Sequence, residues 1–220
     1  MKRLAACAFG VGALAMLASV PAVAQGGFGG KGGVNIANIS VSDETDLPNK
    51  SSRTGIVAGI FGRIDLGPTF ALQGEGLYSQ QGFSAEDQGL TLTLKADYFQ
   101  IPVLAKVIVP TNGGAAPNFF LGPAVSFEAS CKIHGDDGQG NTAEVDCDDP
   151  SGDGFDERGK TDFGIIGGVG LDIVSGAAIF GVEVRYNLGL TNLDTSDSGE
   201  SAKTRVLAIL GNIAFYSPGT

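Results

Sequence analysis

The stretch from Ala177 to Leu190, AAIFGVEVRYNLGL, decides the fold. Every second residue from Ala178 to Leu190 is apolar. The residues between them are mostly small or charged, as at Gly181, Glu183 and Arg185. Successive side chains of a β-strand point to opposite faces, so this alternation predicts a strand with one apolar face.

Other segments alternate in the same way, which gives eight predicted strands in all. The further seven are Lys31 to Ser40, Thr54 to Ile64, Phe70 to Ser79, Leu92 to Val109, Phe119 to Ala129, Asp162 to Ile173 and Leu207 to Phe215. A β-bulge is predicted near Pro102, because proline cannot donate to a strand ladder. After the N-terminal segment no run of 18 apolar residues occurs, which excludes a helical membrane protein.

The connections between these strands alternate in length. Three are short: Asp65 to Pro68, Pro110 to Pro117 and Ser175 to Gly176. The other four are mostly longer and polar: Val41 to Arg53, Gln81 to Gly89, Lys132 to Lys160 and Thr191 to Lys203. Short turns at one rim and long loops at the other are typical of outer-membrane β-barrels.

The polar face of the strands suggests which side is the interior. Small residues punctuated by charges fit the crowded lumen of a narrow barrel, while a branched and aromatic face fits lipid. The charges expected in the lumen are Arg63, Glu75, Lys95, Asp97, Glu128, Glu183 and Arg185. Eight strands leave room only for side chains, so these charges are expected to pair as a plug. The rival arrangement, the lining of a narrow pore, stays open.

The N-terminus reads as an export signal. Lys2 and Arg3 precede an apolar run that ends at Val20, and Ala22-Val23-Ala24 supplies a cleavage pattern. We therefore expect residues 1–24 to be a signal peptide and residues 25–220 to be one barrel domain. The mature part keeps 12 basic and 24 acidic residues, since the signal removes two of the 14 basic ones. Such an acidic chain argues against nucleic acid as a partner.

Four stretches resemble the outer-membrane β-barrel domain family, often labelled porin-family proteins. They are Lys31 to Asn38 (KGGVNIAN), Ala96 to Lys106 (ADYFQIPVLAK), Phe120 to Pro123 (FLGP) and Val184 to Asn192 (VRYNLGLTN). The resemblance implies an all-β fold, an eight-stranded antiparallel up-and-down transmembrane β-barrel, in the outer membrane of a Gram-negative bacterium. It implies no assigned reaction and no cofactor.

Cys131 and Cys147 lie in or beside the longest predicted loop, and an even pair in an exported chain predicts a disulfide. The loop 132–160 is rich in Asp and Glu. From Asp149 to Gly154 it matches the first half of a calcium-binding EF-hand, but Lys160 stands where that template needs Glu. A solvated acidic loop is therefore expected rather than a metal site, and a looser Ca²⁺ site stays open.

The sequence favours a non-enzymatic barrel with a structural or surface-contact role. Its expected partners are outer-membrane lipid and a surface ligand or protein that meets loop 132–160. His134 is the only histidine and lies in that loop, which gives little basis for a Ser-His-Asp arrangement. Two alternatives stay open: a small diffusion pore, and a soluble periplasmic barrel that turns its apolar face inward around an apolar ligand.

Overall fold

The computed structural model describes residues 26–41, 50–87, 90–138, 141–147, 160–191 and 202–217. Nine strands run through these residues. They are β1 (Gly26–Val41), β2 (Lys50–Asp65), β3 (Phe70–Asp87), β4 (Leu90–Ile108), β5 (Ala115–Asp136), β6 (Thr142–Asp146), β7 (Thr161–Ser175), β8 (Ala178–Gly189) and β9 (Ala202–Ser217). Within these ranges no helix is long and apolar enough to cross a membrane.

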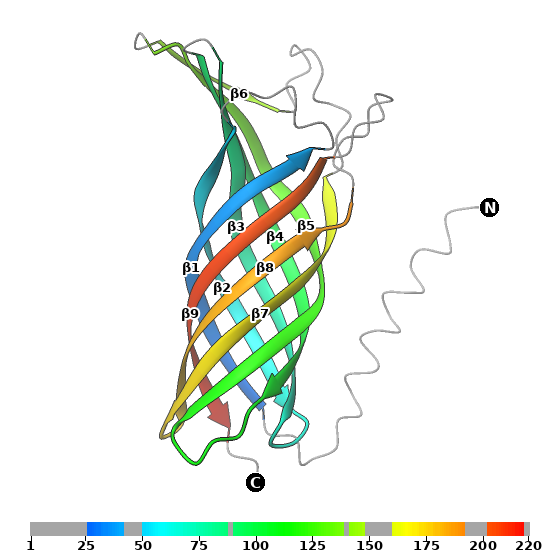
Figure 1. Ribbon diagram of the computed structural model, residues 1–220, viewed down its shortest axis with the longest axis vertical. Coiled ribbons are helices and arrows are strands. Elements are labelled where there is room, and N and C mark those ends of the chain that lie inside the picture. Colours follow the sequence, from blue (N-terminus) through cyan, green and yellow to red (C-terminus); the bar gives the residue numbers. More distant parts are fainter. Residues whose placement is uncertain are drawn as a thin grey trace, which may run out of the picture.

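Eight of the strands close into one antiparallel barrel, as predicted (Figure 1). Each barrel strand pairs with the next barrel strand along the chain. Because β6 is not part of the barrel, β5 pairs with β7 in the wall. The first and last strands then join, with Phe28 opposite Phe215 and Asn35 opposite Ala208. Closure leaves no free edge around the wall, which a sheet in lipid requires because lipid offers no hydrogen-bond partners.

The wall has two chemically different faces. On β8 the outward residues include Phe180, Val182 and Val184, each 40–49% exposed. The inward residues between them include Glu183 and Arg185, which are 2% and 4% exposed. The predicted direction of the faces is confirmed, and the soluble barrel with an inward apolar face is contradicted.

The outward apolar residues form a band around the barrel wall. The band runs along each barrel strand over these ranges: 28–36, 56–64, 70–78, 99–107, 119–127, 163–173, 180–190 and 207–215. Each range covers about 9 to 11 residues, the length that a tilted strand needs to cross a bilayer. Phenylalanine or tyrosine lies at one end or both ends of most of these ranges, where outer-membrane barrels carry aromatic girdles.

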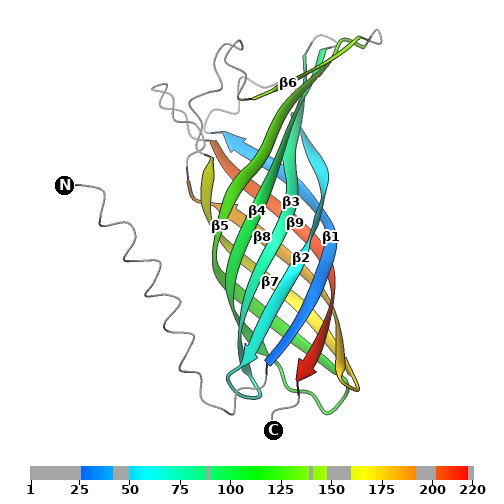
Figure 2. The ribbon, with the colours of Figure 1, turned by 180° about the vertical axis from the view of Figure 1, so that it is seen from behind.

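The short connections meet at one end of the barrel, where β1 begins and β9 ends (Figures 1 and 2). The link from β2 to β3 contains Gly67, with a φ of 137°, and the link from β7 to β8 contains Gly176, with a φ of 63°. Side chains rarely adopt such angles, so glycine suits both turns. Of the predicted long connections Val41 to Arg53 and Thr191 to Lys203, residues 42–49 and 192–201 lie outside the described residues.

Three sequence predictions about the strands are wrong. The connection Gln81 to Gly89 is mostly strand, because β3 runs to Asp87 and β4 starts at Leu90. The loop 132–160 begins as strand, since β5 continues to Asp136 and pairs with β6. The register of β4 is regular at Pro102, and the irregularity lies on β5, where Tyr98 faces Glu128 and Asp97 faces Ser130. Figure 2 shows β3, β4, β5 and β6 rising beyond the rest of the rim.

Gly168, on the inner face of β7, leaves room for the ring of Phe120. A Cβ atom there would lie 2.4 Å from the carbonyl oxygen of Val184 and 2.5 Å from Cζ of the Phe120 ring. Phe120 is buried against Leu104, Ala124 and Ile166, so its ring has little room to move.

We predict that Gly168→Ala lowers the free energy of unfolding by about 1–3 kcal/mol, the usual cost of overpacking. The measurement is a urea titration of the barrel folded into lipid vesicles. Gly62→Ala is the matched control, because a Cβ at Gly62 would meet nothing within 4 Å. Equal unfolding midpoints for the two variants would contradict the prediction.

Candidate functional site

A buried ion-pair cluster crosses the middle of the lumen. Lys31 of β1 lies with its Nζ 2.7 Å from Oε1 of Glu75 on β3 and 2.8 Å from Oε1 of Glu183 on β8. Arg185 donates to Oε2 of Glu75 at 2.8 Å and also to Glu183. Two cations therefore meet two carboxylates, and the cluster ties three strands that are distant along the chain.

Neighbouring side chains complete this cluster. Gln73 donates to Oε1 of Glu75 at 2.7 Å. The Nζ of Lys31 also lies 4.8 Å from the centre of the Phe61 ring, a cation–π contact. Side-chain exposure is at most 4% for each of the four charged residues. Charges buried this deeply are tolerated only when they are paired and hydrogen-bonded.

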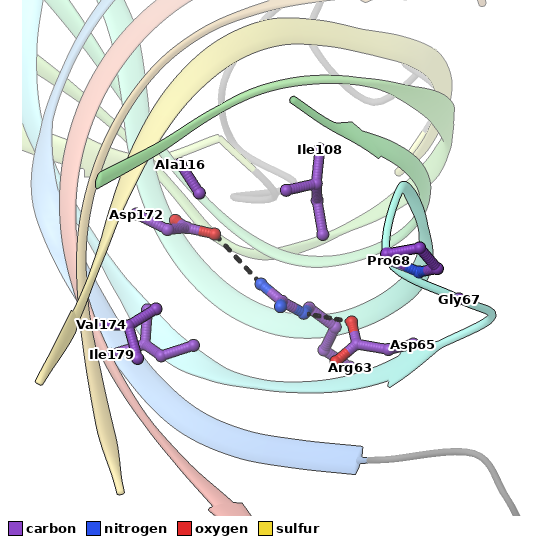
Figure 3. A pocket seen from close by; sticks show the side chains of 9 residues that line it. All are labelled: Arg63, Asp65, Gly67, Pro68, Ile108, Ala116, Asp172, Val174 and Ile179. Carbon is purple, nitrogen blue, oxygen red and sulfur yellow. Dashed lines mark hydrogen bonds and ion pairs between the residues drawn. The ribbon is translucent and has the colours of Figure 1, made fainter. Parts of the chain in front are cut away.

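A second charged cluster lies nearer the short-turn end (Figure 3). Arg63 donates from Nη1 to Asp172 at 3.0 Å and from Nε to Asp65 at 2.8 Å. Lys106 shares the same oxygen of Asp172 at 3.1 Å. This group also contains two cations and two carboxylates, so it adds no net charge to the lumen.

The arrangement brings together some of the predicted lumen charges. Glu75, Glu183 and Arg185 lie in the central cluster, and Arg63 lies in the second one. Glu128 shares the inner face with Tyr98, its partner in the register.

The placement of Lys95 and Asp97 in the lumen is wrong. Asp97 accepts a hydrogen bond from the hydroxyl of Tyr78 at 2.6 Å, and Tyr78 is 42% exposed on the outer face. Lys95 lies 3.6 Å from Glu144, with a side chain that is 36% exposed. The predicted bulge at Pro102 explains the error, because a bulge would reverse the facing of all residues before it.

Sequence reasoning also missed two lumen cations, Lys31 and Lys106. Lys31 lies in a glycine-rich stretch, where glycines give no apolar alternation to follow. Lys106 shares the inner face with Pro102, Leu104 and Ile108, so its strand is apolar on both faces. The spacing along the strand could have found them, because residues an even number of positions apart lie on the same face of a strand. Lys31 lies four positions from the inward residue Asn35, and Lys106 lies six positions from the inward residue Gln100.

Apolar side chains fill much of the rest of the described lumen. Leu77, Leu104, Ile166 and Leu210 are at most 1% exposed; Leu77 and Leu210 belong to one buried apolar group, and Leu104 and Ile166 to another. Beyond the central cluster lies a cavity of about 10 Å³, lined in part by Asn35, Ser79 and Gln81, which is room for about one water molecule. A larger hollow of about 440 Å³ opens at the short-turn mouth, with Arg63 and Asp172 among its lining residues (Figure 3).

We predict that Glu75→Ala lowers the free energy of unfolding by about 3–5 kcal/mol, because it leaves Lys31 and Arg185 with one carboxylate between them. Urea titration in vesicles measures the effect. Glu144→Ala is the control, since Glu144 is an exposed carboxylate whose ion pair stabilises little. A Glu75 variant as stable as the Glu144 variant would disprove the structural role of the central cluster.

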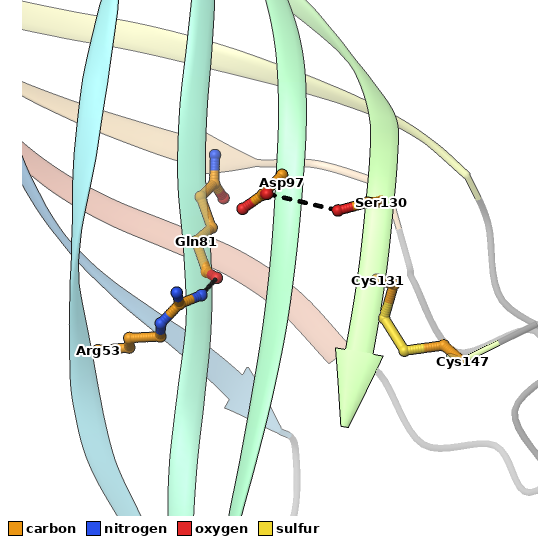
Figure 4. Close-up of a disulfide and its surroundings, with 6 residues drawn as sticks. All are labelled: Arg53, Gln81, Asp97, Ser130, Cys131 and Cys147. Carbon is orange, nitrogen blue, oxygen red and sulfur yellow. Dashed lines mark hydrogen bonds between the residues drawn. A yellow bond between two sulfur atoms is a disulfide. The ribbon is translucent and has the colours of Figure 1, made fainter. Parts of the chain in front are cut away.

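The second feature is the hairpin of β5 and β6 above the rim, which a disulfide closes at its base. Cys131 and Cys147 are bonded, with their Cα atoms 5.4 Å apart (Figure 4). Both cysteines are buried, and the Cys147 amide donates to the Cys131 carbonyl at 3.1 Å. Closing a loop of this size stabilises a chain by about 3 kcal/mol in the chain-entropy model.

The far end of the hairpin is also fixed. Both carboxylate oxygens of Asp137 accept from Asn141, at 3.0 Å from its amide nitrogen and 2.7 Å from its side chain. Between the two ends, Lys132 donates to Glu144 at 2.7 Å. This contact lowers the pKa of Glu144 and raises the pKa of Lys132, so the pair stays ionised over a wide pH range.

We predict that the exported protein resists thiol alkylation until it is reduced and denatured, after which two cysteines react. Intact mass spectrometry counts the added groups. The denatured variant with Cys131→Ser alone should label once without reductant, which shows that the reagent reacts with a free Cys147. Two labels on the unreduced, denatured wild type would contradict a disulfide.

Metal ligands do not gather in the described part of the chain. No group of three or more His, Cys, Asp and Glu side chains is placed to hold an ion there. His134 faces Glu144, with Nδ1 and Oε2 3.9 Å apart. Residues 148–159, which include the EF-hand-like stretch from Asp149 to Gly154, lie outside the described residues. A looser Ca²⁺ site in the loop therefore stays a hypothesis.

Residues 23–195 match the sequence model of the outer membrane protein beta-barrel domain. The chain belongs to this family. The family places the protein in the outer membrane, so the apolar band of the wall faces lipid. No curated protein matches the chain in sequence.

Solved structures similar to this chain include small outer-membrane barrels. Ail of Yersinia pestis is 13% identical, with a TM-score of 0.42, over 87% of this chain and 99% of that one. Neisserial surface protein A is 15% identical, with a TM-score of 0.44, over 86% and 96%. The N-terminal barrel of Pseudomonas aeruginosa OprF is 11% identical, with a TM-score of 0.35, over 83% and 96%.

Proposed function

We propose that this protein is a non-enzymatic, closed outer-membrane barrel that displays the segment 132–160 for contact with a surface ligand or protein. In this proposal residues 1–24 are removed on export, and residues 25–220 form the barrel domain. The observation that carries the proposal is the difference between the two ends: short turns at one rim, and at the other a disulfide-closed hairpin that rises beyond the wall.

The side chains that occupy the lumen favour a structural role for the barrel over transport through it. The central cluster and the second cluster each balance two cations with two carboxylates, so neither offers a free charge to a passing ion. Leu77, Leu104 and Leu210 are fully buried on the inner side of the wall. An ion would have to displace these side chains, because eight strands enclose a space that side chains fill.

We predict that the purified barrel shows no steady conductance in planar lipid bilayers, with a known porin in the same bilayers as the positive control. The double variant Glu75→Ala with Arg185→Ala removes one charge of each sign from the central cluster and should raise conductance above the wild type. Steady wild-type channels would favour the rival function, a small diffusion pore.

The surface end supports the contact role. All five residues of β6 are exposed, and β5 extends six residues beyond Ser130 into the same hairpin. A site on such an extension lies outside the lipid, where loops of outer-membrane barrels meet their partners. The two fixed ends of the hairpin hold its shape, which lowers the entropy lost on binding.

We predict that binding to a panel of immobilised extracellular proteins and glycans depends on this segment. The measurement uses the barrel in lipid nanodiscs, beside a variant in which residues 137–159 and Cys131 are replaced by a short Asn-Gly turn and serine. The barrel of this variant is expected to fold, because the apolar band of β5 ends at Phe127 and that of β7 begins at Phe163, outside the replaced range. Panel binding that is identical for both proteins, or absent for both, would contradict the proposal.

A further inference from the structure

The outer edge of β6 is an unfilled position for one more strand. In the strand order β6 comes last, with β5 on its only paired side among the described residues. The ladder between them has hydrogen bonds from the Cys147 amide to the Cys131 carbonyl and from the Asp137 amide to the Asn141 carbonyl. These two bonds fix which residues of β6 face β5.

Antiparallel pairs alternate between hydrogen-bonded and non-hydrogen-bonded positions. The register pairs Ile133 with Val145 and Gly135 with Ala143, in step with the two bonded positions. The backbone groups of Thr142, Glu144 and Asp146 therefore point away from β5. They present three amides and three carbonyls in a row along an exposed edge.

The edge is held ready for a partner strand. The disulfide fixes it beside Asp146, and the Asp137–Asn141 contacts fix it beside Thr142. The Nζ atoms of Lys132 on β5 and Lys95 on β4 lie 2.7 Å and 3.6 Å from the carboxylate of Glu144. An edge of fixed shape can add a strand without first being ordered, which favours main-chain recognition.

The side chains of β6 define the partner. Thr142, Glu144 and Asp146 share one face, while Ala143 and Val145 share the other, where Val145 is 51% exposed. A strand laid beside β6 would place alternate residues next to the carboxylates and the rest next to Val145. Basic residues fit the first positions and apolar residues the second.

A second copy of this chain fits the edge poorly. An antiparallel pairing of two β6 strands about a two-fold axis would place Glu144 opposite Glu144. Like charges directly opposite each other destabilise a strand pair. That register therefore disfavours a second copy, and the occupant of the edge is taken to be a strand of another protein.

We propose that β6 binds an extended segment of another protein, with alternating basic and apolar residues, as an added antiparallel strand. This inference rests on the proposed surface-contact function and specifies how that contact is made. The main-chain groups of Thr142, Glu144 and Asp146 supply the hydrogen bonds. The carboxylate of Asp146 favours a basic residue beside it, while Glu144 is already paired with Lys132 and Lys95.

The first test uses the synthetic peptide Thr-Lys-Val-Lys-Val-Lys-Thr and the isotope-labelled barrel in nanodiscs. Binding should slow amide hydrogen exchange at Thr142, Glu144 and Asp146 by tenfold or more. It should leave Ala143 and Val145 nearly unchanged, since their amides already face β5. A peptide with N-methyl groups on alternate residues, which block main-chain donation, should bind at least tenfold more weakly. Equal binding of both peptides, or uniform protection along β6, would overturn strand addition.

The second test compares Asp146→Pro with Asp146→Asn. Both variants remove the carboxylate, but only proline removes the outward amide, and it leaves the ladder to β5 intact. Strand addition predicts that Asp146→Pro binds the peptide at least fivefold more weakly than Asp146→Asn. Equal affinities would overturn it, and so would failure of the wild type to bind the peptide.

The two variants also separate this inference from the proposed function. If panel binding depends on residues 137–159 but is the same for Asp146→Pro and Asp146→Asn, surface contact stands and strand addition fails. If panel binding does not depend on the segment at all, both fail. Resistance to alkylation under denaturing conditions before reduction, and labelling at two cysteines after it, checks that each variant still forms its disulfide.

Discussion

The constraint on which the rest of this structure depends is that lipid offers no hydrogen bonds to a peptide backbone. Every strand of the wall must therefore have a neighbour on both sides, which forces β9 to return to β1. With eight strands the closed wall is narrow, so its inner side chains meet across the lumen. The ion pairs of Lys31 with Glu75 and Glu183 follow from that closeness, because charges packed so near one another must cancel.

The same constraint explains what the sequence could reveal. The strands, their antiparallel order and the direction of their faces were predictable. They depend on the two-residue alternation of apolar residues and on the polar connections between strands. β8 shows this well, since its outward residues Phe180 to Leu188 and inward residues Glu183 and Arg185 follow the pattern without interruption. Closure into a barrel followed from the alternating lengths of the connections.

The errors arose where a local pattern carried no information about facing. One extra residue on β5 near Ala129 shifts its pairing with β4, and nothing in the residue types marks that position. Placing the irregularity at Pro102 instead moved Lys95 and Asp97 to the wrong side. Lys106 was missed because its strand is apolar on both faces, and the partners of Lys31 come from strands 44 and 152 residues away. Such distant pairs are a property of the closed cylinder.

The seam between β1 and β9 has a consequence for biogenesis. Lys31 enters with the first strand, but its partner Glu183 arrives only with β8, and the wall beside β1 is missing until β9 is made. A partly synthesised chain would hold an incomplete central cluster, with Lys31 and Glu75 but without Glu183 and Arg185, and two open edges in the bilayer. Insertion should therefore be all-or-none, and truncated products should be left to periplasmic proteolysis rather than accumulate as defective barrels. Because the first strand pairs with the last, the wall closes only when the whole set of strands is present.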